Sequence, residues 1–489
     1  MNLLKTLVGK LVCLFLGASM AVLGLYLFKT LSGPPLDPWH LWKSPAEFHS
    51  QADTISDFPA YLRLETDLLN DLSAFRHTLK TSRISRYSPS NPLAHPVDGF
   101  DWNRTVELQA GTGAGTVLLL HGMSDSPYSL RSLSTAFHHM GMRVLALRLP
   151  GHGTVPASLT RFTWRDMAEA VRLATRYLQS PPRQHEPFYI VGYSNGAALA
   201  LDYTLKSLQN THLPRPSAIV LLSPALAVTP AARFSKLIIG ASYLPGLQKL
   251  AWLSRQPEYD PYKYNSFAVN AGYQVYLLAE RVQEGLRSFH RSGKMETFPP
   301  VLAIQSVVDT TVSSKAVVNL LMTYFHSGKD ELILFDVNRD AEIVTLFAKS
   351  DHHLLESLMN ETADYDLTLV TNCHPDSPRI CARHRPSGHE RVVSSPLAYQ
   401  WPKGIYSLSH VALPIPPNDP VYGTGTDDEP TLGRVELRGE QKLLQVPAAQ
   451  LMRLRYNPFY GYMERRIVEF TLKNANVAET PLQIEEHEN

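Results

Sequence analysis

The stretch VGYSNGAALA, residues 191–200, decides the fold because it joins an expected strand to an expected helix through a serine between two glycines. EPFYIVG before the serine is short and rich in β-branched and aromatic residues, which is typical of a buried strand. NGAALALDYTLKSL after it has apolar residues at helical spacing. The stretch is therefore either an ordinary glycine turn or a strained turn that exposes the hydroxyl group of Ser194 as a nucleophile.

The segments around this stretch alternate between strand and helix patterns. TVLLL, RVLALR and AIVLLS predict strands, whereas SLRSLSTAFHHM and TWRDMAEAVRLATRYL predict helices. Such alternation predicts a mostly parallel sheet with helices on both faces. Active sites in these sheets lie at the carboxyl ends of the strands, which is where Ser194 is expected.

A second strand end carries the sequence His121-Gly122-Met123. An enzyme that transfers an acyl group must stabilise an oxyanion, and two backbone N–H groups suffice for this. Asn195, which follows the serine, and Met123 are the expected donors. Gly122 suits a backbone that approaches the substrate closely. Taken alone, the segment is an unremarkable turn.

Three motifs, in this order, resemble the α/β-hydrolase superfamily: LLLHGMSDSPYSLRSL, RLPGHGTVPASLT and VGYSNG. They are most similar to the branch of monoacylglycerol lipases, carboxylesterases and serine aminopeptidase-like proteins. The strings EYDPYKYNSF and YSLSHVALPIPPNDPVYG resemble a subgroup of bacterial hydrolases with an N-terminal membrane segment. The resemblance implies an α/β-hydrolase fold whose core covers about 110–225 and resumes near 300, with Gly192 and Gly196 flanking the nucleophile at its turn.

The family orders its catalytic residues as serine, acid and histidine. PPVLAIQSVVDTTVSS predicts a strand that ends in Asp309, which resembles the catalytic acid; the alternative is that this residue caps the next helix. The histidine departs from the family spacing. His410 ends the β-rich run GIYSLS and begins a proline-rich loop, so we expect it to be the general base. His352 and His353, in the helical pattern LFAKSDHHLLESLMN, are the alternatives.

These assignments divide the chain into three parts. Residues 1–30 are expected to be a membrane anchor or signal segment, 31–108 an N-terminal helical extension, and 109–489 the hydrolase domain. Within that domain we expect an aromatic-rich cap insertion at 224–298 that forms an apolar acyl pocket. A second insertion near the active site is expected at 340–400, before the catalytic histidine.

The N-terminus contains an uncharged run from Leu11 to Phe28, about 27 Å long as a helix. This length just spans a bilayer. Ser19-Met20-Ala21 resembles a signal cleavage site, but the apolar run continues beyond it as VLGLYLF, which favours an uncleaved anchor. Lysines before the run place the N-terminus in the cytoplasm and the hydrolase domain on the periplasmic side of a bacterial inner membrane; secretion is the alternative.

Composition limits the remaining classes of function. The net charge of +1 provides no electrostatic basis for nucleic-acid binding. Cys373 and Cys381 either pair or remain free thiols, and no Cys/His spacing indicates zinc. GTGAG, residues 111–115, precedes a strand instead of opening a helix, so it does not predict a dinucleotide site. We therefore expect no metal and no cofactor.

The expected function is that of a serine hydrolase that cleaves carboxylic esters through an acyl-serine intermediate. Its expected partners are a small-molecule ester, amphiphilic in character, and a membrane reached through the N-terminal helix. An amidase or peptidase of the serine aminopeptidase-like type is the first alternative, because the same triad performs both reactions. A catalytically inactive, membrane-anchored binding protein is the second.

Overall fold

The fold is built on one ten-stranded sheet, seen in a computed structural model. The structure describes residues 2–51, 55–227, 230–309, 311, 314–325, 327–340, 355, 358–360, 362–426, 431–434 and 446–475. The strand order is β1-β3-β2-β4-β5-β8-β9-β10-β11-β12. Neighbouring strands pair in parallel from β3 through β10, and antiparallel pairs occur at both edges. The expected mostly parallel sheet is confirmed.

The main strands are β1 (Val106–Leu108), β2 (Thr116–Leu120), β3 (Arg143–Leu147), β4 (Phe188–Tyr193), β5 (Ala218–Leu222), β8 (Val301–Ser306), β9 (Glu331–Phe335), β10 (Asp366–Asn372), β11 (Arg379–Arg385) and β12 (Val393–Gln400). The helices are α1 (Asn2–Ser32), α2 (Phe58–His77), α3 (Arg131–His139), α4 (Trp164–Leu178), α5 (Asn195–Gln209), α6 (Ser235–Ser242), α7 (Val269–Arg291), α8 (Ser314–Tyr324), α10 (Ala448–Leu451) and α11 (Tyr460–Lys473). A two-stranded sheet pairs β6 (Trp252–Ser254) with β7 (Phe267–Ala268).

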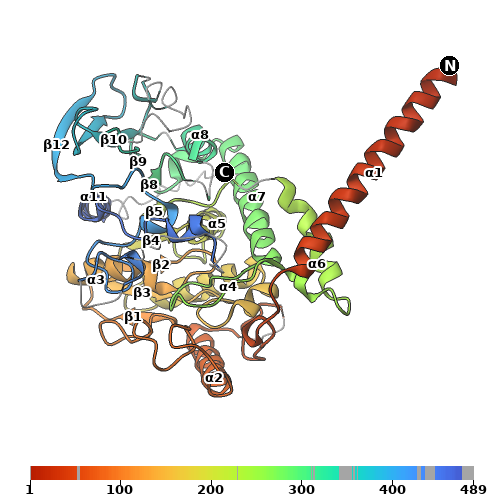
Figure 1. The fold of residues 1–489 in the computed structure, drawn as a ribbon. Helices are drawn as coiled ribbons and strands as arrows, with labels where there is room; N and C mark the ends of the chain where they lie inside the picture. The colour runs from red at the N-terminus through yellow and green to blue at the C-terminus, as the bar shows by residue number, and fades with distance from the viewer. Residues whose placement is uncertain are drawn as a thin grey trace, which may run out of the picture.

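Both faces of the sheet are buried, which explains why the strands read as continuous apolar runs. In β2, Leu118 and Leu120 belong to one core with residues of α4, α5 and α7, whereas Val117 and Leu119 belong to the other core with residues of α3 and α11. Figure 1 shows α3 and α11 on one side of the sheet and α4, α5 and α7 on the other. The alternation follows from the period of two along a strand.

Helix α1 extends away from the rest of the chain, and its carboxyl end lies beside α6 (Figure 1). Apolar side chains that the structure describes on α1 are exposed, among them Phe15 and Leu25. Residues Cys13–Ser32 are long and apolar enough to cross a membrane, as a signal sequence near an N-terminus also is. The last turn is fastened to the folded body: Arg255 donates to the carbonyl of Thr30 (2.7 Å), and Lys249 donates to those of Leu31 (2.8 Å) and Gly33 (2.9 Å).

The segment before β2 packs on the main sheet through buried polar groups. Glu65 of α2 accepts hydrogen bonds from the backbone N–H of Thr105 (2.8 Å) and from Arg148 Nε (3.2 Å). Arg148 also pairs with Glu47 (3.3 Å), and its carbonyl accepts a bond from Tyr61 (2.7 Å). Since buried charges require such partners, these contacts hold the N-terminal extension against the end of β3.

Asp166 joins the same extension to α4. With Thr163 it forms a capping box, in which its carboxylate accepts the Thr163 N–H (2.8 Å). Its other oxygen accepts the N–H (2.8 Å) and the hydroxyl (2.7 Å) of Ser50. Burial raises the pKa of Asp166, but hydrogen bonds from His49, Ser50 and Thr163 outweigh burial and lower that pKa to about 2. The folded state therefore stabilises the ionised form of the Asp166 carboxyl group.

We expect Asp166→Asn to lower the free energy of unfolding by about 2 kcal/mol at pH 7. The reason is that folding lowers the pKa of the Asp166 carboxyl group from 3.8 to about 2, which favours its ionised form. A depressed carboxyl pKa gives stability that is present above the unfolded value of 3.8 and is lost as pH falls through 2. The gap between variant and parent should thus shrink below pH 4 in urea denaturation. The exposed Asp67→Asn serves as the control, with a change under about 0.5 kcal/mol. A pH-independent gap would contradict the assignment.

The structure describes part of the second expected insertion, 340–400. Its described residues form β10, β11 and β12, which extend the sheet at one edge (Figure 1). Cys373 and Cys381 form a disulfide between β10 and β11, so the open alternative is resolved in favour of pairing. None of the described residues of this segment lines the cavity beside Ser194. Residues 341–354 lie outside the described residues, so the expected position of the insertion near the active site stays a prediction.

The expected cap, 224–298, lies between β5 and β8 and contains α6, β6, β7 and α7 in its described part. Helix α7 packs against α5, and Leu278, Val282 and Leu286 belong to the main core. The division of the chain into an extension, a hydrolase domain and a cap stays a prediction.

Candidate active site

Ser194 lies in the turn between β4 and α5, at the carboxyl end of a central strand. Its backbone has φ 55° and ψ −114°, a left-handed conformation that is strained for a residue with a side chain. The turn is held by a bond from its N–H to the carbonyl of Leu222 (2.8 Å) and by bonds to its own carbonyl from the N–H groups of Ala197 and Ala225, both at 3.1 Å. The sequence therefore encodes a strained turn and not an ordinary one.

The two flanking glycines are required by space. A Cβ atom on Gly192 would lie 2.5 Å from Ala197 Cα, and one on Gly196 would lie 2.0 Å from the carbonyl oxygen of Leu120. Contacts this short do not occur between real side chains and backbone. Because Gly196, in the first turn of α5, lies against the end of β2, the helix starts directly beside the loop that follows β2.

That loop lies beside Ser194 and carries Met123, one of the two expected oxyanion donors. A Cβ atom on Gly122 would lie 3.2 Å from Ser194 Cβ, and Met123 lines the cavity beside the serine. Asn195 is the first residue of α5, so its N–H lacks an acceptor within the helix. His121 holds this loop in place through two hydrogen bonds. Its Nδ1 donates to the carbonyl of Gly122 (2.8 Å), and its Nε2 accepts from the Leu149 N–H (3.1 Å). Burial lowers the pKa of His121 well below its usual value, so the ring stays neutral and can play both parts.

Asp309 lies in the turn after β8, three residues beyond the strand end at Ser306. One carboxylate oxygen accepts from the Thr311 N–H (2.8 Å), and the other accepts from Gln305 Nε2 (3.1 Å) and lies 2.6 Å from His410 Nδ1. The expected acid and the expected base are thus in direct contact, although 101 positions separate them. The histidine side chain is 5% exposed and the aspartate is fully buried.

The strand expected before His410 is wrong, although the contact of His410 with Asp309 is present. GIYSLS is not a strand; residues 404–409 are irregular, and His410 begins a short 3-10 helix, His410–Ala412. Among the described residues, this segment belongs to neither of the two sheets. The alternatives His352 and His353 lie outside the described residues.

Tertiary bonds hold His410 in place of a strand. Ser306 at the end of β8 donates to the carbonyl of Leu408 (2.9 Å), and Ser409 donates to the carbonyl of Leu454 (2.5 Å). Tyr193, directly before Ser194, donates to the carbonyl of His410 (3.2 Å). Sequence reasoning missed these anchors because serine and tyrosine hydroxyls are too common to carry a signal by themselves.

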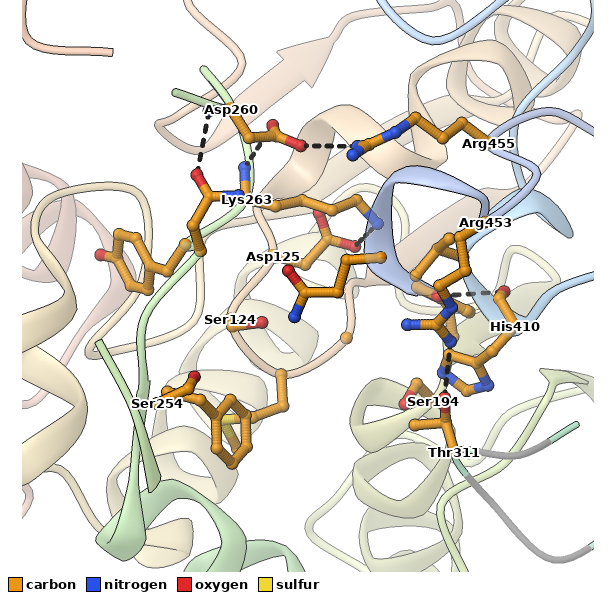
Figure 2. A pocket seen from close by; sticks show the side chains of 18 of the residues that line it. Ser124, Asp125, Ser194, Ser254, Asp260, Lys263, Thr311, His410, Arg453 and Arg455 are labelled. Carbon is orange, nitrogen blue, oxygen red and sulfur yellow. Dashed lines mark hydrogen bonds and ion pairs between the residues drawn. The ribbon is translucent and has the colours of Figure 1, made fainter. Parts of the chain in front are cut away.

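Ser194 and His410 both line one cavity of about 430 Å³, and Figure 2 shows both side chains at its wall. One part of the wall is apolar and comes from the loop after β2 and from the expected cap, through Met123, Phe267 and Val275. Another part is charged and comes from the loop after β2, the expected cap and the C-terminal segment, through Asp125, Asp260, Lys263, Arg453 and Arg455. Within the described residues, no group of three or more His, Cys, Asp or Glu side chains is arranged to hold a metal ion.

The two long strings that carried the resemblance meet above this cavity. Asp260, from EYDPYKYNSF, accepts a hydrogen bond from Tyr422, from YSLSHVALPIPPNDPVYG. Asp419 of the second string accepts bonds from Tyr128 at 2.9 and 3.1 Å. Their shared role is to connect the cap, the loop after β2 and the segment that carries His410.

Comparison with known proteins places the chain in a family. The model described as "Alpha/beta hydrolase family" matches residues 117–379, which is more than half of the chain. The chain belongs to the alpha/beta hydrolase family. The match begins in β2 and ends in β11, so it includes the strained turn and the turn after β8.

Individual relatives are more distant. A thermostable monoacylglycerol lipase from Bacillus sp. (strain H-257) is 33% identical over 92 residues, which cover 19% of this chain and 36% of the lipase. The chain thus matches about a third of the length of that relative. The structure of a monoacylglycerol lipase from Paleococcus ferrophilus is 19% identical, with 47% of this chain and 88% of that chain covered and a TM-score of 0.35. A thermostable carboxyl esterase from Bacillus coagulans is 17% identical, with 48% and 90% covered and a TM-score of 0.34.

Proposed function

We propose that this protein is a serine hydrolase that cleaves carboxylic esters, with Ser194, His410 and Asp309 as its catalytic triad. The observation that carries the proposal is the contact of 2.6 Å between His410 Nδ1 and Asp309 Oδ2 at a cavity that Ser194 also lines. Membership of a hydrolase family and partial identity to a monoacylglycerol lipase support the same reaction class.

In the proposed mechanism, His410 Nε2 removes the proton of Ser194 Oγ while the oxygen attacks the ester carbonyl carbon. The backbone N–H groups of Met123 and Asn195 stabilise the resulting oxyanion. When the tetrahedral intermediate collapses, His410 gives its proton to the departing alcohol and leaves an acyl-serine. Water, activated by the same imidazole, then releases the acid. Asp309 holds the ring orientation and stabilises the imidazolium.

The apolar wall supports an acyl chain as the group bound beside the serine. Met123, Phe267 and Val275 provide contact surface for methylene groups, and each buried methylene contributes about 0.8 kcal/mol. An ester of modest chain length therefore fits the proposal better than a strongly polar acyl group. The cap supplies two of the three residues, so it contributes to the choice of acyl group.

Two substrate panels test the reaction class. The first is a series of para-nitrophenyl esters of increasing acyl length, and the second is the matching series of para-nitroanilides. We expect kcat/KM on esters to rise with chain length and anilide turnover to be lower by orders of magnitude. Faster turnover of aminoacyl anilides would assign the amidase alternative. Absence of both activities, together with no reaction with a fluorophosphonate probe, would assign the inactive binding protein.

We also propose that α1 anchors the enzyme in a membrane, with the catalytic domain outside the cytoplasm. Described apolar side chains such as Phe15 and Leu25 are exposed on this helix, and its carboxyl end is bonded to the expected cap by Lys249 and Arg255. Cations at this end also interact favourably with the helix dipole and satisfy carbonyl groups that lack helical partners.

A chain that begins at Lys29 tests the anchor, because it keeps the carbonyl groups that the cap binds. We expect this truncated protein to leave the membrane fraction and to retain the ester turnover of the full chain. Fractionation and activity measurement on both forms provide the readout. If the full-length gene instead yields a soluble mature protein that begins near Val22, α1 is a cleaved signal and secretion is the correct alternative.

A further inference from the structure

The cavity wall near His410 carries an arginine that pairs with none of the described carboxylates. The cationic side chains among the described lining residues are Lys263, Arg453 and Arg455. Lys263 pairs with Asp125 at 3.2 Å, and Arg455 pairs with Asp260 at 3.3 Å. The partner of Arg453 is a hydroxyl group: its Nη2 donates to Thr311 Oγ1 at 2.7 Å.

Among the residues that the structure describes, no carboxylate forms an ion pair with Arg453. Lining cations and anions therefore do not balance, and the excess positive charge belongs to this side chain. A guanidinium group has five N–H donors in a planar fork that matches carboxylate and phosphate groups. One bond to Thr311 leaves most of that capacity for a molecule in the cavity.

The position of Arg453 is set by the same elements that set the proposed triad. Thr311, which accepts its bond, donates its own N–H to Asp309 at 2.8 Å. On the other side, the carbonyl of Leu454 accepts the bond from Ser409, which precedes His410. Figure 2 shows the guanidinium group joined to Thr311 on the His410 side of the cavity. The apolar residue Phe267 belongs to the expected cap, which lines the cavity from a different part of the chain.

The position of Arg453 on the His410 side of the cavity indicates which half of the ester it contacts. The general acid must deliver its proton to the departing oxygen, so the alcohol half of a substrate lies on the His410 side of Ser194. The acyl half then lies toward the apolar wall. A cation fastened beside His410 faces the alcohol half.

We propose that Arg453 binds a negative charge on the alcohol half of the substrate, so that the preferred substrates are esters with an anionic leaving group, a carboxylate or a phosphate. The inference rests on the proposed ester hydrolase function and adds the substrate class. Arg453 is a specificity-determining residue and takes no part in proton transfer.

A matched pair of esters tests this assignment. The butanoyl ester of para-hydroxybenzoate has an anionic leaving group, and that of para-hydroxybenzamide is its neutral isostere. Binding is measured by calorimetry in a Ser194→Ala background, so that the result does not depend on turnover. We expect Arg453→Gln to weaken binding of the benzoate ester about tenfold relative to the benzamide ester, the effect of one partly exposed charge-assisted contact. Arg453→Lys should restore part of this difference, because charge returns without the fork.

The controls separate specificity from structure. Arg63→Gln removes an exposed charge on α2, outside the cavity, and should leave both affinities unchanged. Equal weakening of both esters by Arg453→Gln would mean a structural role and would overturn the proposal. The proposal would also be overturned if Arg453→Gln weakened only the binding of an anionic acyl group. That result would appear as weaker binding of para-nitrophenyl hemisuccinate but not of para-nitrophenyl butyrate. If the protein preferred the benzoate ester over the benzamide ester but the parent protein hydrolysed neither, the anion site would stand and the hydrolase function would be rejected.

Discussion

We expect the largest effect from Ser194→Ala, which should abolish ester turnover and fluorophosphonate labelling. The hydroxyl group is the proposed nucleophile, and no neighbouring group replaces an attacking oxygen. Loss of a triad nucleophile lowers kcat by roughly 10⁴-fold or more. Mass spectrometry of the labelled parent should place the phosphonate on the tryptic peptide that contains Ser194. Covalent labelling of the alanine variant at comparable rate would show that another serine reacts.

The fold should survive this change. The strained turn is held by backbone bonds to Leu222, Ala197 and Ala225, none of which uses the hydroxyl group. Removing a β-substituent from a residue at φ 55° does not add strain. We therefore expect an unchanged melting temperature. Ser180→Ala, at an exposed position after α4, is the matched control and should keep full activity and labelling.

The second large effect is expected at His410. Without its imidazole, neither the attacking hydroxyl nor the departing alcohol has a proton carrier, so His410→Ala should lower kcat by several orders of magnitude with a smaller change in KM. Asp309→Asn should cost about 10⁴-fold, because the amide cannot hold the ring as the carboxylate does at 2.6 Å. Pre-steady-state kinetics with para-nitrophenyl esters would measure both changes.

Non-additivity distinguishes a triad from independent contributions. If Ser194 and His410 act as one unit, the double variant should be no slower than the single variants. The exposed His374→Ala is the control histidine and should retain full turnover. The assignment fails if His410→Ala keeps most of its activity while His352→Ala or His353→Ala loses it, since those residues were the alternatives.

Local sequence was sufficient for the sheet, its two apolar faces and the turn at Ser194. Each of these depends on neighbours in the chain: the run FYIVGY forms β4, and glycines at 192 and 196 are required within a few residues of the serine. The expected acid was also readable, because Asp309 follows a strand, β8, whose apolar run is evident. The expected cap and the apolar N-terminal run were readable as composition, whereas the boundaries of such segments depend on packing.

Tertiary structure decided which histidine meets the acid. The pattern before His410 suggested a strand, which the structure does not contain. The contact depends instead on bonds made by Ser306, Tyr193 and Ser409 to residues that lie 102, 217 and 45 positions away in the chain. Strands β10 to β12 occupy the sheet edge between, so the loops that carry Asp309 and His410 stay at the same end of the sheet despite the long separation. That Arg453 bonds a hydroxyl group and no described carboxylate was equally hidden, because a sequence records which charges are present but not which of them find partners. Local periodicity determines secondary structure, whereas the partners of a side chain are determined by distances that exist only after the chain has folded.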